Sequence, residues 1–246
     1  MIRRIYRRRY LLLDTALEFI LTDGKSYKIL PTAKDYKRIG EGDTGLNTGG
    51  MGAYSPSRLE SENLDKKILD QIINPTIKAL EDMNTKFKGF LYAGLMIVQN
   101  EPYLIEYNVR MGDPECQTIL PRLKTNFFEI VKAVINENLG QINIEWSNNK
   151  TLSIVLCSQG YPESFESDKE IKNLDKIFFK KNEFIFHAGT KIKNTKIISS
   201  GGRILNFVAG STSFNECRKI VFELIKKVDL KKSFYRKDIG YRVINK

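Results

Sequence analysis

Three polar residues, Glu106, Asn108 and Arg110, occupy every second position of one apolar segment. Side chains of a β-strand point alternately to its two faces, so these three are predicted to share one face, with Tyr107 and Val109 on the other. Carboxylate and amide oxygens are ligands that Mg²⁺ accepts beside nucleotide phosphates, and the arginine fork fits a phosphate or a carboxylate. The row therefore predicts a metal and phosphate site. The alternative is the polar face of an edge strand.

Two further features lie on either side of this row in the sequence. Gly112, Asp113 and Pro114 come after it, turn the chain and add a carboxylate. Residues 34–56, KDYKRIGEGDTGLNTGGMGAYSP, precede it and are rich in glycine. Such a segment is predicted to be a loop without regular structure, whose backbone N–H groups could close around an anion. It matches neither the P-loop nor the Rossmann fingerprint, and a flexible linker is the alternative.

Composition limits the protein classes that fit this chain. A chain of 246 residues has room for one large or two modest domains, and 41% hydrophobic with 28% charged residues is typical of a globular protein. No apolar run approaches the ~20 residues that span a bilayer, so no membrane association is predicted. The three cysteines form no CxxC pair, which favours a reducing, cytoplasmic location. His187, the only histidine, is predicted to be a hydrogen-bonded structural residue.

The formal charge of +11 raises the question of nucleic-acid binding. The lysines are spread along the whole chain, and no aromatic RNA-binding signature or zinc finger is present, so no nucleic-acid partner is predicted. Residues 1–15 alone are dense in arginine. They could be an organelle transit peptide, a solvated start, or a segment unrelated to the rest of the chain.

The elements that must position the polar row can be predicted from local patterns. Residues 16–31 are predicted to be a hairpin around an Asp-Gly turn. Residues 61–83 are predicted to be a helix capped by Ser61 and kinked or interrupted at Pro75. Residues 90–98 and 103–109 are predicted to be antiparallel strands, both apolar enough for the centre of a sheet, and the second carries the row.

The rest of the chain is predicted in the same way. Short helices are expected over 115–123 and, after an Asn126 cap, over 127–136. An Asn-rich stretch ending near 150 is typical of a domain boundary. Beyond it, strands are expected at 152–157, 183–187, 197–198 and 203–209, followed by a helix from a Ser213 cap to 228. The predicted class is α+β in two domains, 16–150 and 151–246, after the atypical basic segment 1–15.

Six motifs in order carry a family resemblance from about residue 22 to 244: KDYKRIGEGDTGLNTGGMGAYSP, GFLYAGLM, IEYNVRMGDPE, FHAGT, GGRIL and RKDIGYR. Together they resemble the phosphoribosylamine–glycine ligases (glycinamide ribonucleotide synthetases), which are ATP-grasp enzymes of purine biosynthesis. The resemblance implies that residues 16–150 are the metal- and substrate-bearing half of an ATP-grasp fold. Residues 151–246 would be the small α+β C-terminal domain of the ligase.

The resemblance also implies a reaction, in which ATP, glycine and 5-phosphoribosylamine give glycinamide ribonucleotide, ADP and phosphate through a glycyl phosphate. Glu106 and Asn108 match the family's ligands for Mg²⁺ (or Mn²⁺), and ATP is the co-substrate. Arg110 would steady a phosphate or the glycyl phosphate, and Asp113 would orient the amine. The residues implied to bind substrate are Lys37, Asn47, Thr48, Gly49, Gly50, Met51, Gly52 and Asp113. No catalytic role is implied for His187.

The chain departs from the family pattern at its start. The family's N-terminal domain, its lysine-bearing glycine-rich loop and a strand of the type EEFLxGEExS have no counterpart in this sequence. We therefore expect residues 1–15 to be an out-of-frame or alternative start of a truncated gene. We also expect little or no ligase activity from the chain alone, unless a separate polypeptide supplies the absent half. The alternatives are another ATP-grasp carboxylate–amine ligase, a non-catalytic remnant and a basic binding module.

Overall fold

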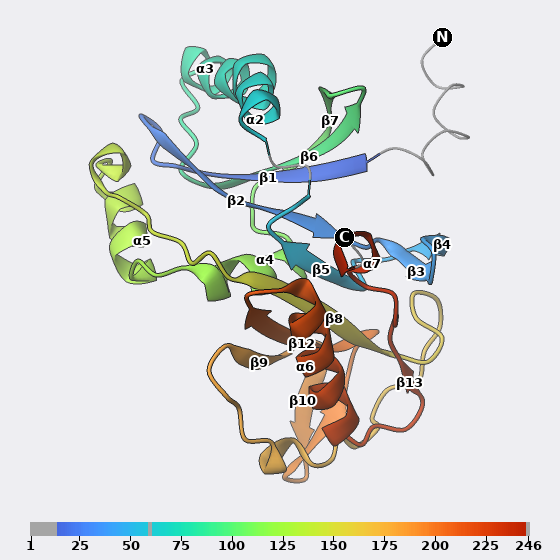
Figure 1. The fold of residues 1–246 in the computed structure, drawn as a ribbon. Coiled ribbons are helices and arrows are strands. Elements are labelled where there is room, and N and C mark those ends of the chain that lie inside the picture. Colours follow the sequence, from blue (N-terminus) through green and yellow to red (C-terminus); the bar gives the residue numbers. More distant parts are fainter. Residues whose placement is uncertain (1–13, 59–60, 245–246) are drawn as a thin grey trace. The chain divides into compact units, whose positions relative to one another are not determined.

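The computed structural model describes residues 14–58 and 61–244, which form two compact units (Figure 1). The first unit comprises the chain up to residue 34 together with 56–112 and 123–146, and the second comprises 35–55, 113–122 and 147 to the end. Residues 35–55 and 113–122 thus pack with the C-terminal residues, across the predicted boundary near 150. The arginine-rich segment lies outside the described residues except for its last two positions.

The first unit is an antiparallel sheet covered by helices. Its strand order is β7(Glu101–Asn108), β6(Gly89–Val98), β1(Asp14–Thr22), β2(Tyr27–Asp35), of which the last residue already belongs to the second unit. The predicted hairpin is confirmed, with Thr22 paired to Tyr27 across the Asp-Gly turn. The predicted strand pair is also confirmed, although β7 lies at the edge of the sheet that the described residues form, and not at its centre.

A helical layer closes one face of this sheet, as Figure 1 shows for α2(Glu62–Ile68) and α3(Asn74–Asp82). The Ser61 side chain caps α2 by accepting from the Leu64 amide, as predicted. A π-helical turn, η1(Leu69–Ile73), separates the two helices and ends just before Pro75, so the helix is interrupted ahead of the proline. The buried core of this layer is made by Ile20, Leu64, Ile68, Ile72, Ile73, Leu91, Ala93, Leu95 and Ile97.

The strand that carries the polar row is bulged. Gly94 pairs with Glu106 whereas Leu95 pairs with Leu104, so Ile105 is an extra residue on β7. Four successive residues, Tyr103 to Glu106, are exposed, so burial does not alternate along this part of the strand. α5(Phe127–Ile135), capped by the Asn126 side chain as predicted, and η3(Leu139–Gln141) complete the unit.

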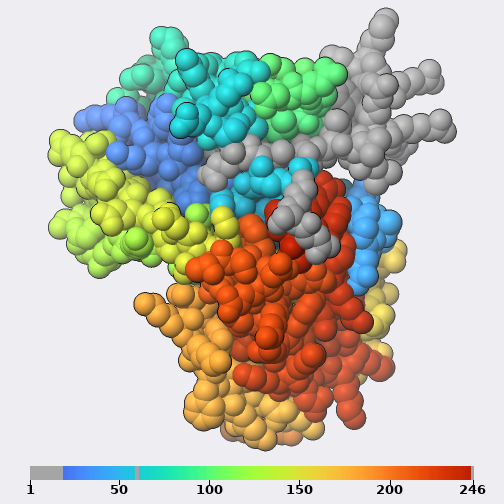
Figure 2. Space-filling model, in the orientation of Figure 1, coloured from blue at the N-terminus to red at the C-terminus, as the bar shows by residue number. Residues whose placement is uncertain are grey.

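The second unit is built on a sheet of order β5(Gly52–Ser55), β8(Lys150–Ser158), β12(Arg203–Ser211), β9(Glu183–His187), with β13(Ser233–Phe234) also paired to β8. α6(Phe214–Lys227), capped by Ser213 as predicted, packs its Cys217, Val221, Leu224 and Ile225 into the core below the sheet. The outer surface of α6 is visible in the space-filling view (Figure 2). Smaller elements are α4(Glu115–Ile119), η2(Leu120–Arg122), η4(Leu174–Lys176), β10(Thr190–Lys193), β11(Lys196–Ser199) and α7(Tyr241–Ile244).

The prediction of an irregular loop over 34–56 is wrong. The segment contains β3(Arg38–Gly40) and β4(Thr44–Asn47), which form a hairpin, and it continues into β5. Gly42, in the turn between the two strands, has a φ of +68°, a conformation that glycine adopts readily, and Gly45 within β4 has a φ of +78°. β5 is regular because it pairs with β8, with Gly52 opposite Ile154. Between β4 and β5, residues 48–51 remain a loop.

Among the described residues, no helix combines the length and the apolar character needed to cross a bilayer. The cysteines Cys116, Cys157 and Cys217 are all free thiols. His187 is exposed, and its Nδ1 lies 2.9 Å from the Thr190 hydroxyl, in agreement with the predicted hydrogen-bonded histidine.

Candidate functional site

Glu106 and Asn108 lie side by side on one face of β7. The Asn108 amide donates to Glu106 Oε1 over 3.1 Å, so alternation does place both side chains together. Tyr107 points to the opposite face, where its hydroxyl lies 2.6 Å from that of Thr76 in the helical layer. Arg110 follows the end of the strand, and its Nη1 donates to the Met111 carbonyl over 3.0 Å. The first unit thus presents two adjacent oxygen-bearing groups with an exposed guanidinium two residues on.

Gly94 makes room for the carboxylate of this pair. A Cβ on Gly94 would lie 3.1 Å from Glu106 Cγ, which is tighter than ordinary van der Waals contact. The Glu106 side chain therefore lies over Gly94 of β6, where an added Cβ would push it aside by a few tenths of an ångström. No role for Gly94 was predicted from the sequence, although this glycine belongs to the GFLYAGLM motif. Gly94 lies opposite Glu106 because of the bulge at Ile105, which the sequence alone does not reveal.

The Glu106–Asn108 pair fits a divalent metal of the magnesium type. Mg²⁺ usually keeps several waters and is bound by one or two carboxylates together with substrate phosphates, so the exposed Glu106 and the half-buried Asn108 are a suitable protein share. Within the described ranges, no group of three or more His, Cys, Asp or Glu residues could hold a metal. A site on β7 would thus be completed by substrate and water.

The second unit contains the glycine loop, defined as residues 48–52. The Thr48 hydroxyl donates to the Lys37 carbonyl over 2.8 Å and accepts from the Gly50 amide over 3.0 Å. The Gly49 amide donates to the Tyr161 hydroxyl over 2.9 Å. Gly50 has a φ of +119°, and a Cβ there would lie 2.5 Å from Pro114 Cδ. The loop is therefore packed closely against the turn at Asp113 and Pro114.

Arg203, the first residue of β12, joins this loop to Asp113. Its Nη1 donates to the carbonyls of Gly49, over 2.9 Å, and Asp113, over 2.7 Å. Its Nη2 is paired with Asp113 Oδ2 at 2.9 Å, and Gln117 donates to the other carboxylate oxygen over 3.0 Å. Both oxygens of the half-exposed Asp113 carboxylate are thus held in a fixed orientation.

A second charged cluster is formed by Asp35, Lys37 and Glu115. The ammonium of Lys37 lies 2.7 Å from Asp35 Oδ2 and 3.8 Å from Glu115 Oε1. Glu115 is fully buried, and neither of its carboxylate oxygens has a hydrogen-bond partner among the described residues. Burial, followed by repulsion from Asp35, raises the pKa of Glu115 to about 7, whereas the charge of Lys37 opposes the shift.

The structure thus brings together most of the residues that the sequence assigned to substrate. Lys37, Thr48, Gly49, Gly50 and Asp113 are linked within the second unit by the contacts above. Met51 and Gly52 are buried, and a Cβ on Gly52 would lie 2.5 Å from the Ser153 carbonyl, so they fix the loop to the sheet. Asn47 is exposed at the end of β4, paired with Arg38.

Sequence reasoning missed the residues that hold this group in place, namely Asp35, Glu115, Tyr161 and Arg203. Glu115 and Arg203 lie in the motifs IEYNVRMGDPE and GGRIL, so a signal existed. Their roles were hidden because Arg203 contacts a loop 154 residues away in the sequence.

Arg203→Met tests the link between loop and turn. We expect the substitution to cost about 1–3 kcal/mol of stability in the second unit, since charge-assisted hydrogen bonds to Asp113 are lost. We also expect the backbone amide signals of Gly49 and Gly50 to shift in NMR spectra. Lys196→Met is the matched control, because Lys196 on β11 is paired with Glu170 in the same unit and forms no ion pair or hydrogen bond with the loop or Asp113 within the described residues. Unchanged Gly49 and Gly50 signals in the Arg203 variant would contradict the assignment.

Known proteins are similar to this chain over almost its whole length. The family model for the phosphoribosylglycinamide synthetase ATP-grasp (A) domain matches residues 15–116, and that for the C domain of the same synthetase matches residues 151–242. A phosphoribosylamine–glycine ligase of Brucella melitensis is 38% identical over 233 residues, covering 95% of this chain and 55% of that protein. One from Agrobacterium fabrum is 40% identical over 231 residues, covering 94% of this chain and 54% of that protein.

Solved structures place the fold in the same group. A crystal structure of phosphoribosylamine–glycine ligase from Thermotoga maritima superposes with a TM-score of 0.79 at 34% identity, covering 92% of this chain and 56% of that one. A Campylobacter jejuni biotin carboxylase, with a TM-score of 0.57 at 12% identity over 92% of this chain and 48% of that one, shows a similar fold. The chain spans about half the length of the curated relatives it matches. With both family models matched in order, the chain has an ATP-grasp fold and belongs to the phosphoribosylglycinamide synthetase family.

Proposed function

We propose that this chain is the metal- and substrate-holding part of a phosphoribosylamine–glycine ligase. The reaction joins glycine to 5-phosphoribosylamine with ATP and gives glycinamide ribonucleotide, ADP and phosphate. The observation that carries the proposal is the Glu106–Asn108 pair, two oxygen donors side by side on an exposed strand face. The proposal is also supported by relatives, since two phosphoribosylamine–glycine ligases align with 94% and 95% of the chain.

Glu106 and Asn108 would hold Mg²⁺ or Mn²⁺ in this proposal. When bound, such a metal neutralises charge on the phosphates of ATP during phosphoryl transfer to the glycine carboxylate. Arg110 would bind the phosphate of the resulting glycyl phosphate. Its guanidinium is exposed and, within the part of the chain that the structure describes, donates only to the neighbouring Met111 carbonyl, so most of its donors face solvent.

The second unit would hold phosphoribosylamine. The attacking amine forms a bond to the acyl carbon, the carbon–phosphate oxygen bond breaks, and the amine loses a proton as phosphate leaves. Asp113 suits the task of orienting this amine because Arg203 and Gln117 fix both of its carboxylate oxygens. Lys37 supplies positive charge for the sugar phosphate beside the glycine loop, whose amides at residues 48–51 are already hydrogen-bonded within the unit. Asn47 adds an exposed amide beside the loop.

Metal binding tests the first part of the proposal. Mn²⁺ titrated with ATP into the protein is expected to broaden the NMR signals around Glu106 and Asn108. Glu106→Gln should weaken Mn²⁺ binding at least about tenfold, since loss of one charged interaction exceeds about 1.4 kcal/mol. Glu101→Gln is the matched control, because Glu101 lies on the same strand but is paired with Lys67. Equal Mn²⁺ affinity in wild type, Glu106→Gln and Glu101→Gln would contradict the assignment of Glu106 as a metal ligand.

Product analysis tests the whole reaction. The protein is incubated with ATP, Mg²⁺, glycine and phosphoribosylamine, and the product is identified by mass spectrometry. Glycinamide ribonucleotide formed only when both organic substrates are present supports the ligase. A product built from a different carboxylate or amine would instead favour another ATP-grasp ligase.

A further inference from the structure

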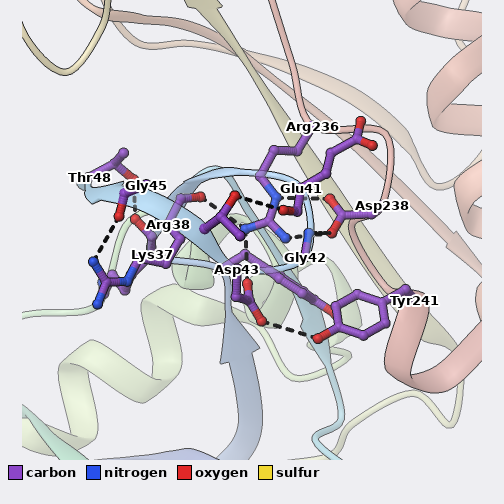
Figure 3. A network of polar contacts seen from close by, with 12 residues as sticks. Lys37, Arg38, Glu41, Gly42, Asp43, Gly45, Thr48, Arg236, Asp238 and Tyr241 are labelled. Atoms are coloured by element: carbon purple, nitrogen blue, oxygen red, sulfur yellow. Dashed lines mark hydrogen bonds and ion pairs between the residues drawn. The ribbon is translucent and has the colours of Figure 1, made fainter. Parts of the chain in front are cut away.

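The tip of the β3–β4 hairpin is held by a segment almost two hundred residues later in the chain. Arg236 is only 1% exposed. Its Nη1 donates to the Arg38 carbonyl over 2.9 Å and to Asp43 Oδ1 over 3.0 Å, and its Nε and Nη2 donate to both Asp238 oxygens (Figure 3). Asp238 Oδ2 also accepts from the Gly42 amide over 2.9 Å. Arg236 and Asp238 together therefore tie three points of the hairpin, Arg38, Gly42 and Asp43, to the C-terminal segment, defined as residues 236–242.

The same segment also holds the base of the hairpin. The Arg236 guanidinium lies over the Tyr36 ring, 5.0 Å from its centroid, and the Gly240 amide donates to the Tyr36 hydroxyl over 3.1 Å. Tyr36 is 1% exposed. Figure 3 shows Asp43 reaching Tyr241 on the far side of the network. Tyr36 and Arg38, the neighbours of Lys37 on both sides, are thus each held directly by this segment.

Residues 36–38 carry the glycine loop on their other side. The Tyr36 amide donates to the Gly52 carbonyl over 3.0 Å, and the Met51 amide donates to the Tyr36 carbonyl over 2.8 Å. The Lys37 carbonyl accepts from both the amide and the hydroxyl of Thr48. A displacement of 36–38 must therefore displace Lys37 and the glycine loop together.

We propose that Arg236 is a positioning residue, which fixes residues 36–38 and thereby sets the place of Lys37 and the glycine loop. That this loop receives a sugar phosphate rests on the proposed function; that Arg236 fixes it does not. Direct ligand binding by Arg236 is disfavoured, because each of its three nitrogens already donates and the side chain is buried. Its charge is matched by Asp43 and Asp238, so the buried guanidinium is compensated within the cluster.

Amide hydrogen exchange of the folded protein tests the positioning role. In Arg236→Met, the amides of Thr48 and Met51 are expected to exchange roughly 10- to 100-fold faster, the effect of losing one charge-assisted hydrogen bond on local opening. Val221→Ala is the matched control, since Val221 is fully buried on α6 and its truncation destabilises the unit while leaving the hydrogen bonds of Arg236 in place. Unchanged loop exchange, or equal acceleration in both variants, overturns the inference.

Ligand titration then separates the two proposals. Ribose 5-phosphate, a stable sugar phosphate, is titrated into wild type and Arg236→Met, and the affinity is expected to fall at least about tenfold in the variant. If wild type does not bind it, the substrate assignment fails while the exchange result still decides the role of Arg236. Arg236→Lys keeps the charge without the planar fork, and it replaces the methionine variant in both measurements if that variant does not fold. The loop amides of Arg236→Lys should exchange faster than those of wild type and, where Arg236→Met folds, more slowly than those of Arg236→Met.

Discussion

Gly50→Ala is expected to destabilise the second unit by about 2–5 kcal/mol and to disrupt the glycine loop, a large effect for a single added methyl group. Two independent causes add. The φ of +119° at Gly50 lies outside the conformations that alanine adopts at low cost. The new Cβ would also lie 2.5 Å from Pro114 Cδ, an atom of a rigid ring that cannot rotate away.

Gly42→Ala separates these two causes. Gly42 also has a positive φ, +68°, but no described atom lies within 4 Å of the position its Cβ would take. The control should therefore cost only the left-handed backbone penalty, about 1–2 kcal/mol. Urea unfolding followed by the NMR amide signals of β8 measures both variants. Trp146 is unsuitable as the probe because it belongs to the first unit. Equal midpoints for the two variants would mean that the contact with Pro114 is not restrictive.

The same comparison has a functional arm. Gly50→Ala should weaken ribose 5-phosphate binding at least about tenfold, because the loop cannot keep its hydrogen bonds to Thr48 while moving away from Pro114. Gly42→Ala should bind like wild type. Loss of binding in both variants would place the critical element at the hairpin tip instead of the loop.

Features decided by neighbouring residues could be predicted from the sequence. The caps at Ser61, Asn126 and Ser213 are confirmed because a cap depends on a few adjacent residues and backbone groups. The shared face of Glu106 and Asn108 follows from strand alternation over three residues. These predictions need no knowledge of which segment lies next to which.

Features that depend on pairing between segments far apart in the sequence could not be predicted from the sequence. The bulge at Ile105 appears only when β7 is aligned with Gly94 of β6, and the short strand β5 is regular only because β8 lies beside it. Arg236 belongs to the polar motif RKDIGYR, yet it is buried, because its acceptors include a hairpin residue 198 positions earlier. A charged residue is buried where partners surround it, and local composition does not contain that information.

Glu115→Gln is expected to make the second unit more stable at pH 8 and nearly unchanged at pH 4.5. Glu115 is fully buried, its carboxylate oxygens accept no hydrogen bond from the described residues, and Asp35 adds repulsion, so its pKa rises to about 7 from an ordinary value of 4.5. A raised carboxyl pKa means that the folded state binds the proton more tightly than the unfolded state. The wild-type protein should therefore lose stability as pH rises from about 4.5 to 7 and then level off.

The size of this loss follows from the shift. The difference between a pKa of about 7 and one of 4.5, at about 1.4 kcal/mol for each pKa unit, gives about 3–4 kcal/mol as the upper bound at pH 8. Glutamine keeps the shape of the side chain but has no charge to desolvate, so the stability of the variant should be flat over this range. Urea unfolding midpoints of wild type and Glu115→Gln are measured at pH 5, 6, 7 and 8. The difference between the two midpoints should widen as the pH rises.

Glu223→Gln is the control for this pH series, since Glu223 is an exposed carboxylate on α6 in the same unit, and its curve should run parallel to that of wild type. A Glu115→Gln curve that also runs parallel would show that Lys37 compensates the buried carboxylate fully, despite the 3.8 Å between them. A widening separation would instead show that the unit retains an unfavourable ionised carboxylate close to Lys37. Natural proteins tolerate such a cost mainly where the charge takes part in binding or catalysis, so the pH series also bears on whether Lys37 and Glu115 act on a ligand.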